Sequence, residues 1–173
     1  METWDIYDVR RRPTGRTMLR GEAVQAGDYH LVVHVIFFNR AGQMLIQQRQ
    51  SCKRSWPEYW DISVGGCAIQ GESSQQAAMR EVREELGLLV DLSAAAPDLT
   101  LSFPGGFDDM YIVERELEAE TLELQAEEVK TARWADRREI LALLAQGGFV
   151  PYRPSLMELL FDLRDHKGGL MSR

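Results

Sequence analysis

Residues 66–88 read GCAIQGESSQQAAMREVREELGL, a segment that places four glutamates and two arginines in one short loop and helix. Ser73 and Gln76 have the spacing of a capping box, in which the two side chains satisfy backbone N–H groups at the first turn of a helix. Gly87 follows the last apolar residue of the helical pattern and is typical of a helix C-terminus. The sequence therefore predicts a helix that begins after Ser73 and ends at Gly87.

Three of the glutamates, Glu81, Glu84 and Glu85, share one face of this helix, because positions i, i+3 and i+4 lie together. The apolar residues lie on an adjacent face, so we expect the acidic stripe to be exposed at the rim of the core. Like charges at this spacing repel one another, and more strongly when partly desolvated. Hard cations such as Mg²⁺ and Mn²⁺ take carboxylate oxygens and also reach substrate phosphates. The spacing alone is more typical of a solvated surface helix, but a stripe that binds a metal favours phosphate chemistry.

The segment matches every defined position of the pattern G-x5-E-x7-R-E-U-x-E-E-x-G-U, where U is a bulky aliphatic residue, and it thereby resembles the Nudix box. The matching residues are Gly66, Glu72, Arg80, Glu81, Val82, Glu84, Glu85, Gly87 and Leu88. The resemblance implies an α/β fold of the Nudix type, an α/β/α sandwich with a mixed β-sheet. It also implies Mg²⁺ or Mn²⁺ as cofactor and hydrolysis of a nucleoside diphosphate linked to another moiety, such as a nucleotide sugar.

The same resemblance implies roles for individual residues. It makes Glu81, Glu84, Glu85, Glu72 and the Gly65 carbonyl the metal site, with Glu72 supporting the loop and Arg80 orienting the carboxylates. Glu84 is the first choice for the general base that activates water, and Glu85 is the second. Glu127 and Glu128 stay open as alternatives, because related enzymes often place an acid in the loop before the corresponding strand, and the number of metals stays open too.

Residues 30–73 also resemble isopentenyl-diphosphate isomerases, which share the Nudix fold. The similarity includes an R-x-x-x-K motif at Arg49 and Lys53, followed by W-P-x-x-W at residues 56–60. In the isomerases these two basic residues grip the substrate diphosphate, which implies the same role for Arg49 and Lys53. Arginine offers a bidentate fork to phosphate oxygens and lysine a point charge, so the assignment is physically reasonable.

The isomerase chemistry itself is not expected. Gly65 stands where the isomerase resemblance requires the catalytic cysteine, and Cys67 stands where it requires a metal-binding histidine. His30 matches one isomerase metal ligand, but Ala23 occupies the position of another. We therefore expect a pyrophosphohydrolase, with an isomerase-like enzyme or a catalytically quiet ligand sensor as alternatives. The histidines lack metal-ligand spacing, so we interpret His34 as structural.

The remaining chain predicts one domain over residues 1–173, with residues 1–28 as an N-terminal hairpin extension that turns at residues 13–15. Strands are expected at residues 31–38, 44–49, 60–64 and 110–117 and around Trp134, and helices at residues 137–145 and 155–166.

The formal net charge of −7 argues against a nucleic-acid partner, which would require a broad cationic face. Two cysteines give no disulfide framework and favour a reducing compartment. The N-terminus lacks the pattern of a signal peptide, and no apolar stretch is long enough to span a membrane. We expect a cytoplasmic protein whose partner is a small-molecule diphosphate, while a homodimer stays open.

Overall fold

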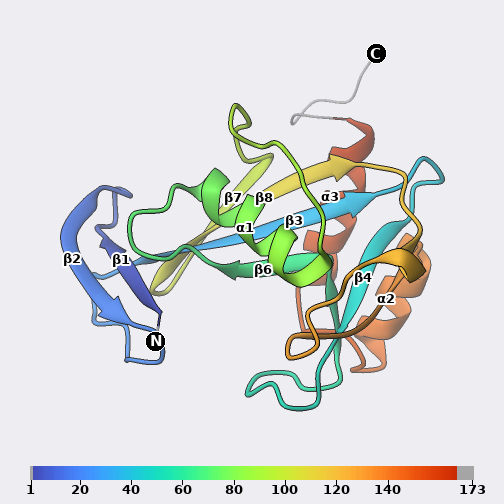
Figure 1. Ribbon diagram of the computed structural model, residues 1–173, viewed down its shortest axis with the longest axis horizontal. Coiled ribbons are helices and arrows are strands. Elements are labelled where there is room, and N and C mark those ends of the chain that lie inside the picture. The colour runs from blue at the N-terminus through green and yellow to red at the C-terminus, as the bar shows by residue number, and fades with distance from the viewer. Residues whose placement is uncertain (1, 167–173) are drawn as a thin grey trace.

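The computed structural model describes residues 2–166 (Figure 1). In chain order its elements are β1 (Thr3–Tyr7), β2 (Pro13–Leu19), β3 (His30–Phe38), β4 (Met44–Arg49), β5 (Trp60–Ile62), β6 (Val64–Cys67), α1 (Ser74–Leu86), β7 (Leu99–Phe103), β8 (Gly106–Glu114), the short 3₁₀ helix η1 (Ala119–Thr121), β9 (Val129–Ala135), α2 (Arg137–Ala145) and α3 (Pro154–Asp165).

Seven strands form one mixed sheet in the order β5-β4-β3-β8-β7, with β6 also beside β3 and β9 also beside β4. The pair β3–β8 is parallel, and every other strand pair is antiparallel. Strands β3 and β4 pair only at Phe38 and Met44, next to the turn that joins them. Beyond that point the two strands separate, and β6 lies along β3 while β9 lies along β4.

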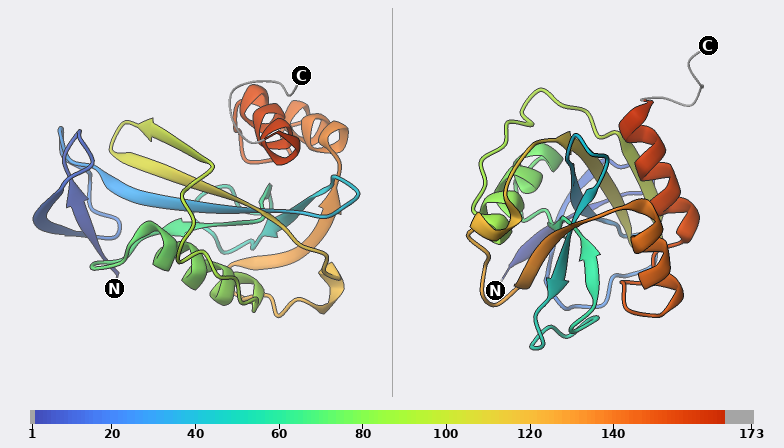
Figure 2. Two further views of the ribbon diagram at one scale, coloured as in Figure 1. Left: turned by 90° about the horizontal axis from the view of Figure 1, so that it is seen from above. Right: turned by 90° about the vertical axis from the view of Figure 1, so that its right-hand side faces the viewer.

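Helices cover both faces of this sheet, as Figure 2 shows. Alternate residues of β3 point to opposite faces, because side chains along a strand have a period of two. Val35 and Phe37 pack with α1 on one face, and Ile36 and Phe38 pack with α2 and α3 on the other. The predicted α/β/α sandwich with a mixed sheet is confirmed.

Strands β1 and β2 form a separate two-stranded sheet at one end of the molecule (Figure 1). The predicted turn at residues 13–15 is wrong, because the chain reverses between Tyr7 and Pro13 and Pro13 already belongs to β2. The Asp8 carboxylate accepts the Arg12 backbone N–H at 2.9 Å, and Arg11 adopts a left-handed φ of 59°. Side-chain capping by Asp8 therefore determines where the hairpin turns.

The other boundaries follow the expectations closely, with three differences. Residues 60–64 form not one strand but β5 and the start of β6. The strand predicted at residues 110–117 is β8, which begins at Gly106, because residues 103–106 close a hairpin with the unpredicted β7, and ends at Glu114. Both long C-terminal helices are present. Within residues 2–166, each helix falls short of the length and apolar character that a membrane-spanning helix needs.

Candidate active site

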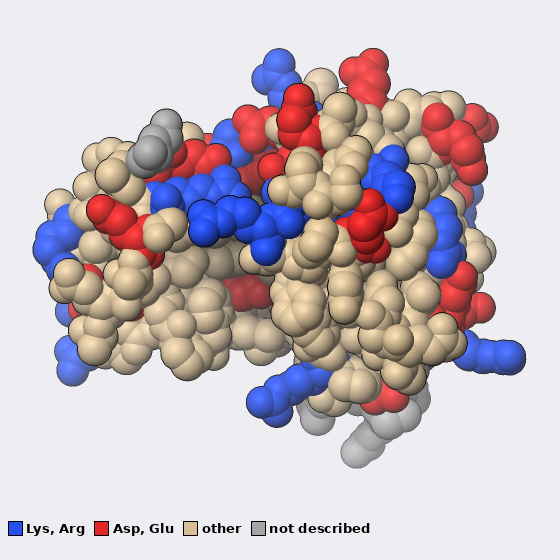
Figure 3. All heavy atoms as spheres, turned by 90° about the horizontal axis from the view of Figure 1, so that it is seen from below, with Lys and Arg blue, Asp and Glu red and all other residues tan. Residues whose placement is uncertain are grey.

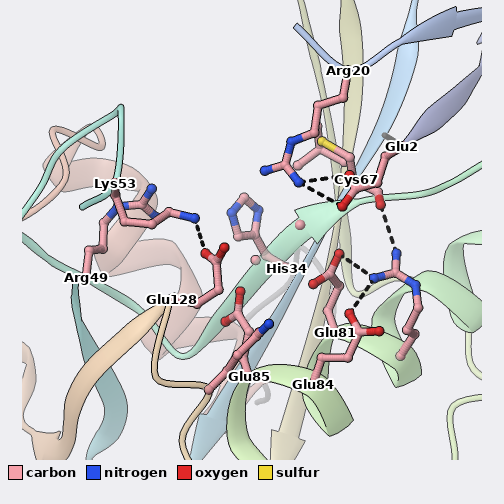
Figure 4. A pocket seen from close by; sticks show the side chains of 15 residues that line it. Glu2, Arg20, His34, Arg49, Lys53, Cys67, Glu81, Glu84, Glu85 and Glu128 are labelled. Atoms are coloured by element: carbon pink, nitrogen blue, oxygen red, sulfur yellow. Dashed lines mark hydrogen bonds and ion pairs between the residues drawn. The ribbon is translucent and has the colours of Figure 1, made fainter. Parts of the chain in front are cut away.

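A pocket of about 270 Å³ opens between α1, β3, β6, the loop after β4 and the N-terminal hairpin (Figure 4). Its acidic lining residues are Glu2, Glu81, Glu84, Glu85 and Glu128, and its basic ones are Arg20, Arg49, Lys53 and Arg80. Figure 3 shows a face on which Lys and Arg side chains form a band next to acidic ones. The protein is acidic overall, yet positive charge is concentrated locally.

Helix α1 begins and ends as its sequence predicts. The Ser73 hydroxyl accepts the Gln76 N–H at 3.2 Å, and the Gln76 side chain accepts the Ser73 N–H at 2.8 Å. Gly87 ends the helix in the left-handed conformation, with φ of 68°. Buried Ala78 and Val82 hold α1 against the sheet, so the direction of its glutamates is fixed by packing.

Arg80 connects three carboxylates. Its Nε and Nη2 atoms donate to Glu72 at 2.8 and 3.0 Å, and its Nη1 donates to both Glu81 and Glu84 at 2.9 Å. Nη2 also donates to the Cys67 carbonyl at 3.0 Å. The guanidinium thereby ties the loop that carries Glu72 to α1 and neutralises part of the negative charge of the pocket.

Glu81 lies directly against the backbone of β6. A Cβ atom at Gly66 would overlap the Glu81 carboxylate, so glycine is required for this close approach. Burial raises the pKa of Glu81, and the neighbouring Arg80 opposes that shift. The carboxylate therefore faces the pocket from a confined position.

Glu85 departs from expectation. It is only 5% exposed, so the prediction that the whole acidic stripe is exposed is wrong for Glu85, and only Glu84 of the three is exposed. Gln47 on β4 donates to a Glu85 carboxylate oxygen at 2.9 Å. Burial raises the pKa of Glu85 well above its usual value, and the charge of Glu81 adds to the effect. The physical reason is that Glu85 faces the sheet one turn beyond Glu81, where β4 covers it.

Arg49 and Lys53 line the same pocket as the glutamates. Arg49 Nη1 donates to the Asp61 carboxylate at 3.0 Å, and the other Asp61 oxygen accepts the Tyr152 hydroxyl at 2.9 Å. Lys53 forms an ion pair with Glu128. The structure thus brings the two basic residues of the R-x-x-x-K motif to the acidic stripe.

The sequence interpretation missed His34. Its side chain lines the pocket, and its Nδ1 forms a hydrogen bond with Asp108 Oδ1 at 2.7 Å. Burial lowers the pKa of His34, but the charge and hydrogen bond of Asp108, together with the charge of Asp61, raise the pKa overall. A Cβ atom at Gly65 would lie 2.5 Å from the His34 ring. No sequence spacing links His34 to Asp108 or to Gly65, because β8 and β6 reach β3 only through the fold.

The surroundings of four further residues indicate whether they can belong to the site. Burial raises the pKa of the Cys67 thiol to about 12, so it stays protonated and is no nucleophile. His30 stacks on Trp4 with ring centroids 4.7 Å apart, in keeping with a structural role. Of the two open acids in the loop before β9, Glu128 lines the pocket, whereas Glu127 is not among the lining residues.

The donors of the pocket suit a hard divalent cation, because carboxylate and backbone carbonyl oxygens are the ligands such ions prefer. Glycine at position 66 leaves room for the Glu81 carboxylate at the pocket wall. Within residues 2–166, however, no three acidic, histidine or cysteine side chains converge on one point in ligand geometry. Arg80 explains this arrangement, since it holds the carboxylates of Glu72, Glu81 and Glu84. The donor set fits a divalent metal in chemical kind, while Arg80 holds three of its carboxylates.

The α/β/α fold and this acidic pocket with its basic rim define a class of enzymes that act on phosphate compounds. The NUDIX domain family model matches residues 28–157. An uncharacterized Nudix hydrolase of Listeria monocytogenes is 46% identical over 165 residues, which are 95% of this chain and 96% of the relative. The chain belongs to the Nudix family, and it is a pyrophosphohydrolase that acts on phosphorus-containing anhydrides.

The chain is also similar, more distantly, to a protein of known structure and to an isomerase. A protein from Deinococcus radiodurans of known crystal structure has a TM-score of 0.73 and 25% identity, with 92% of this chain and 97% of that chain covered. An isopentenyl-diphosphate Delta-isomerase of Salmonella heidelberg is 28% identical over 143 residues, which are 78% of this chain and 77% of the relative. The resemblance to isomerases in residues 30–73 thus has a counterpart among known proteins.

Proposed function

We propose that the protein hydrolyses a diphosphate linkage in a nucleoside diphosphate derivative, with Mg²⁺ or Mn²⁺ as cofactor and in the cytoplasm. One observation carries the proposal: the carboxylates of α1 and the basic side chains of Arg49 and Lys53 line the same pocket. The carboxylates suit a divalent cation, and the basic side chains suit the diphosphate that such a cation accompanies.

The residues that would hold the metal are Glu81, Glu84, Glu85 and the carbonyl of Gly65, with Glu72 acting through Arg80. When bound, the ion supplies charge neutralisation at the diphosphate and lowers the pKa of a coordinated water. Glu72 lies 2.8 Å from Arg80 Nε, so its role is to fix the guanidinium and, through it, Glu81 and Glu84.

Arg49 and Lys53 would bind and orient the diphosphate. Arg49 is held in place before substrate arrives, because its Nη1 donates a hydrogen bond to Asp61 at 3.0 Å. The Tyr152 hydroxyl donates to Asp61 in turn and fixes its carboxylate. Lys53 would exchange its ion pair with Glu128 for a phosphate oxygen. The positive charge at this rim then offsets the charge that accumulates on the substrate during hydrolysis.

Glu84 is the group that we assign as general base. Its side chain is 48% exposed and can reach water, whereas Glu85 is buried and hydrogen-bonded to Gln47. Glu128 lines the pocket and stays a second candidate for this role, since its position beside Lys53 is also open to substrate.

The nucleoside assignment is supported by one aromatic pair near Lys53. Trp56 is 45% exposed and lies on the same loop, with its ring centroid 5.4 Å from that of Tyr59. An exposed indole can stack on a nucleobase. Two other aromatic residues are less available, since Phe107 is buried and Trp60 lies under Arg133.

Hydrolysis is favoured over double-bond isomerisation because Gly65 offers no thiol, and the His34 ring fills the space that a side chain there would need. A catalytically quiet sensor is disfavoured by the complete set of box carboxylates. We infer that isopentenyl diphosphate can bind the basic rim without interconverting with dimethylallyl diphosphate.

The test is a metal-dependent screen of nucleotide, dinucleotide, nucleotide-sugar and prenyl diphosphates, scored for released phosphate or nucleoside monophosphate. We expect turnover of at least one nucleoside compound with Mg²⁺ or Mn²⁺ and none with EDTA. Glu84→Gln should abolish most of it, while Glu158→Gln, at an exposed position on α3, is the matched control. Turnover of prenyl diphosphates alone, or isomerisation detected by NMR, would refute the nucleoside hydrolase assignment.

A further inference from the structure

The N-terminal hairpin contributes to the pocket although it lies outside the main sheet. It is fixed to the loop before α1 by two contacts: Gln70 N–H donates to the Thr3 carbonyl at 2.8 Å, and Gly71 N–H donates to the Asp5 carboxylate at 2.7 Å. Because the loop also carries Glu72, the hairpin and the acidic site are held in one arrangement. Arg20, the residue after β2, is thereby placed at the pocket rim.

Arg20 has unused hydrogen-bonding capacity. Its Nη1 donates to both Glu2 carboxylate oxygens, at 2.9 and 2.8 Å, and within residues 2–166 neither Nε nor Nη2 makes a hydrogen bond. The Arg20 side chain is 52% exposed. An arginine with a free edge of this kind can bind an oxyanion through two parallel N–H groups.

The basic residues lie at two ends of the pocket, as Figure 4 shows, with Arg49 and Lys53 at one side, Arg20 at the other and His34 between them. The chain separates the two ends as well. Arg20 follows β2 of the N-terminal hairpin, whereas Arg49 ends β4 of the main sheet and Lys53 lies in the loop after it. The two basic ends therefore address different parts of a substrate.

We propose that Arg20 forms a second anion-binding subsite and that the preferred substrate carries a further anionic group beyond the two phosphoryl groups of the cleaved linkage. The inference rests on the proposed function, in which Arg49 and Lys53 bind the diphosphate. A substrate with a neutral second moiety leaves Arg20 without a ligand, whereas a third phosphoryl group or an equivalent anion would reach it. The substrate class is therefore a nucleoside triphosphate or a diphosphate whose second moiety is itself anionic.

Glu2 acts in the opposite sense in this arrangement. Its carboxylate partly neutralises Arg20 and repels an incoming anion, so loss of its charge should strengthen anion binding at the subsite. If the Arg20–Glu2 ion pair served only the structure of the hairpin, Arg20→Gln and Glu2→Gln would both weaken anion binding. The two residues therefore allow a test by sign as well as by size.

The experiment is calorimetric titration with imidodiphosphate and diimidotriphosphate, whose P–N–P bridges resist hydrolysis, at a fixed concentration of Mg²⁺. The wild type should bind the longer analogue more tightly. Arg20→Gln should weaken that binding at least about tenfold, as expected for a lost charge-assisted hydrogen bond, and should leave imidodiphosphate within about twofold. Glu2→Gln should strengthen binding of the longer analogue. Arg12→Gln, an equal charge change in the turn at the far end of the hairpin, should change neither.

Other outcomes separate this inference from the proposed function. Equal effects of Arg20→Gln on both analogues, no effect on either, or weaker binding in both Arg20→Gln and Glu2→Gln would overturn the subsite. In that case, if Arg49→Ala weakens the binding of both analogues in the same experiment, the diphosphate site stands without the Arg20 subsite. If the wild type binds neither analogue, or Arg49→Ala changes neither, the diphosphate site and the subsite are both overturned.

Discussion

Replacing Arg80 by alanine should destabilise the protein by about 3 kcal/mol in the presence of EDTA. The substitution removes the shared counter-charge of three carboxylates. Glu72 and Glu81 have side chains only 17% and 14% exposed, so their ion pairs are poorly screened by solvent. Breaking a buried pair by removing one partner costs about 3–5 kcal/mol. Glu84 is 48% exposed and adds little, which puts our value at the low end of that range.

Urea unfolding with EDTA and with excess Mg²⁺ measures this effect. At a free metal concentration 100 times the dissociation constant, binding to the native state adds about 2.7 kcal/mol. Mg²⁺ should stabilise the wild type, and it should stabilise Arg80→Ala by more, because the unpaired carboxylates gain a counter-charge. The control is Arg83→Ala, since Arg83 is exposed on the same helix and makes no ion pair within residues 2–166. The reasoning would be refuted if Arg80→Ala lost less than about 1 kcal/mol of unfolding free energy in EDTA, or if the control variant lost as much. It would also be refuted if the unfolding curve of the wild type did not change with Mg²⁺.

Three other perturbations test separate parts of the site and fold. Glu84→Gln and Glu85→Gln should each lower kcat about 10²- to 10⁴-fold while circular dichroism shows an intact fold, and near-wild-type rates in both would contradict the hydrolytic assignment. Arg49→Ala and Lys53→Ala should each weaken substrate binding by about 1.5–3 kcal/mol, seen in KM, with a much smaller change in metal affinity. Asp109 is fully buried and forms an ion pair with Arg11; burial alone would raise the pKa of Asp109, but the hydrogen bonds from Arg11, Ser74 and Thr100 and the charge of Arg11 together lower it. The contribution of ionised Asp109 to the free energy of unfolding is present above the pKa of the unfolded state and is lost as pH falls through the lower pKa of the folded state. Asp109→Asn should therefore be about 3 kcal/mol less stable at pH 7, and urea unfolding at decreasing pH should show that gap closing; a gap that is constant with pH would argue against the ion pair.

The features that could be predicted from sequence depend on short-range geometry. The capping box at Ser73, the left-handed Gly87 and the helix between them involve residues in one segment, where spacing and residue type determine the contacts. The alternation of β3 and the apolar faces of the helices likewise indicate which residues face the core. The R-x-x-x-K motif pointed to residues that do reach the acidic pocket, because the resemblance carried long-range information that spacing alone lacks.

The features that sequence could not provide depend on contacts between distant segments. The burial of Glu85 requires Gln47, which lies 38 positions away on β4. The pairing of His34 with Asp108 requires the parallel register of β3 and β8. The hairpin turn was misplaced because proline and glycine are strong turn formers in isolation, whereas the side chain of Asp8 decides the turn. Long-range register and side-chain capping are therefore the missing information.

The hairpin has its own small core of Trp4, Ile6 and Met18 and forms its own sheet, while the glutamates that we assign to catalysis lie on α1. In the arrangement that we propose, recognition of the far end of the substrate and cleavage of its linkage are encoded in different stretches of the gene. Mutation or recombination upstream of residue 30 can change the hairpin without altering the residues of the Nudix box. Lineages that exchange this segment could diversify in substrate preference while keeping one hydrolytic centre.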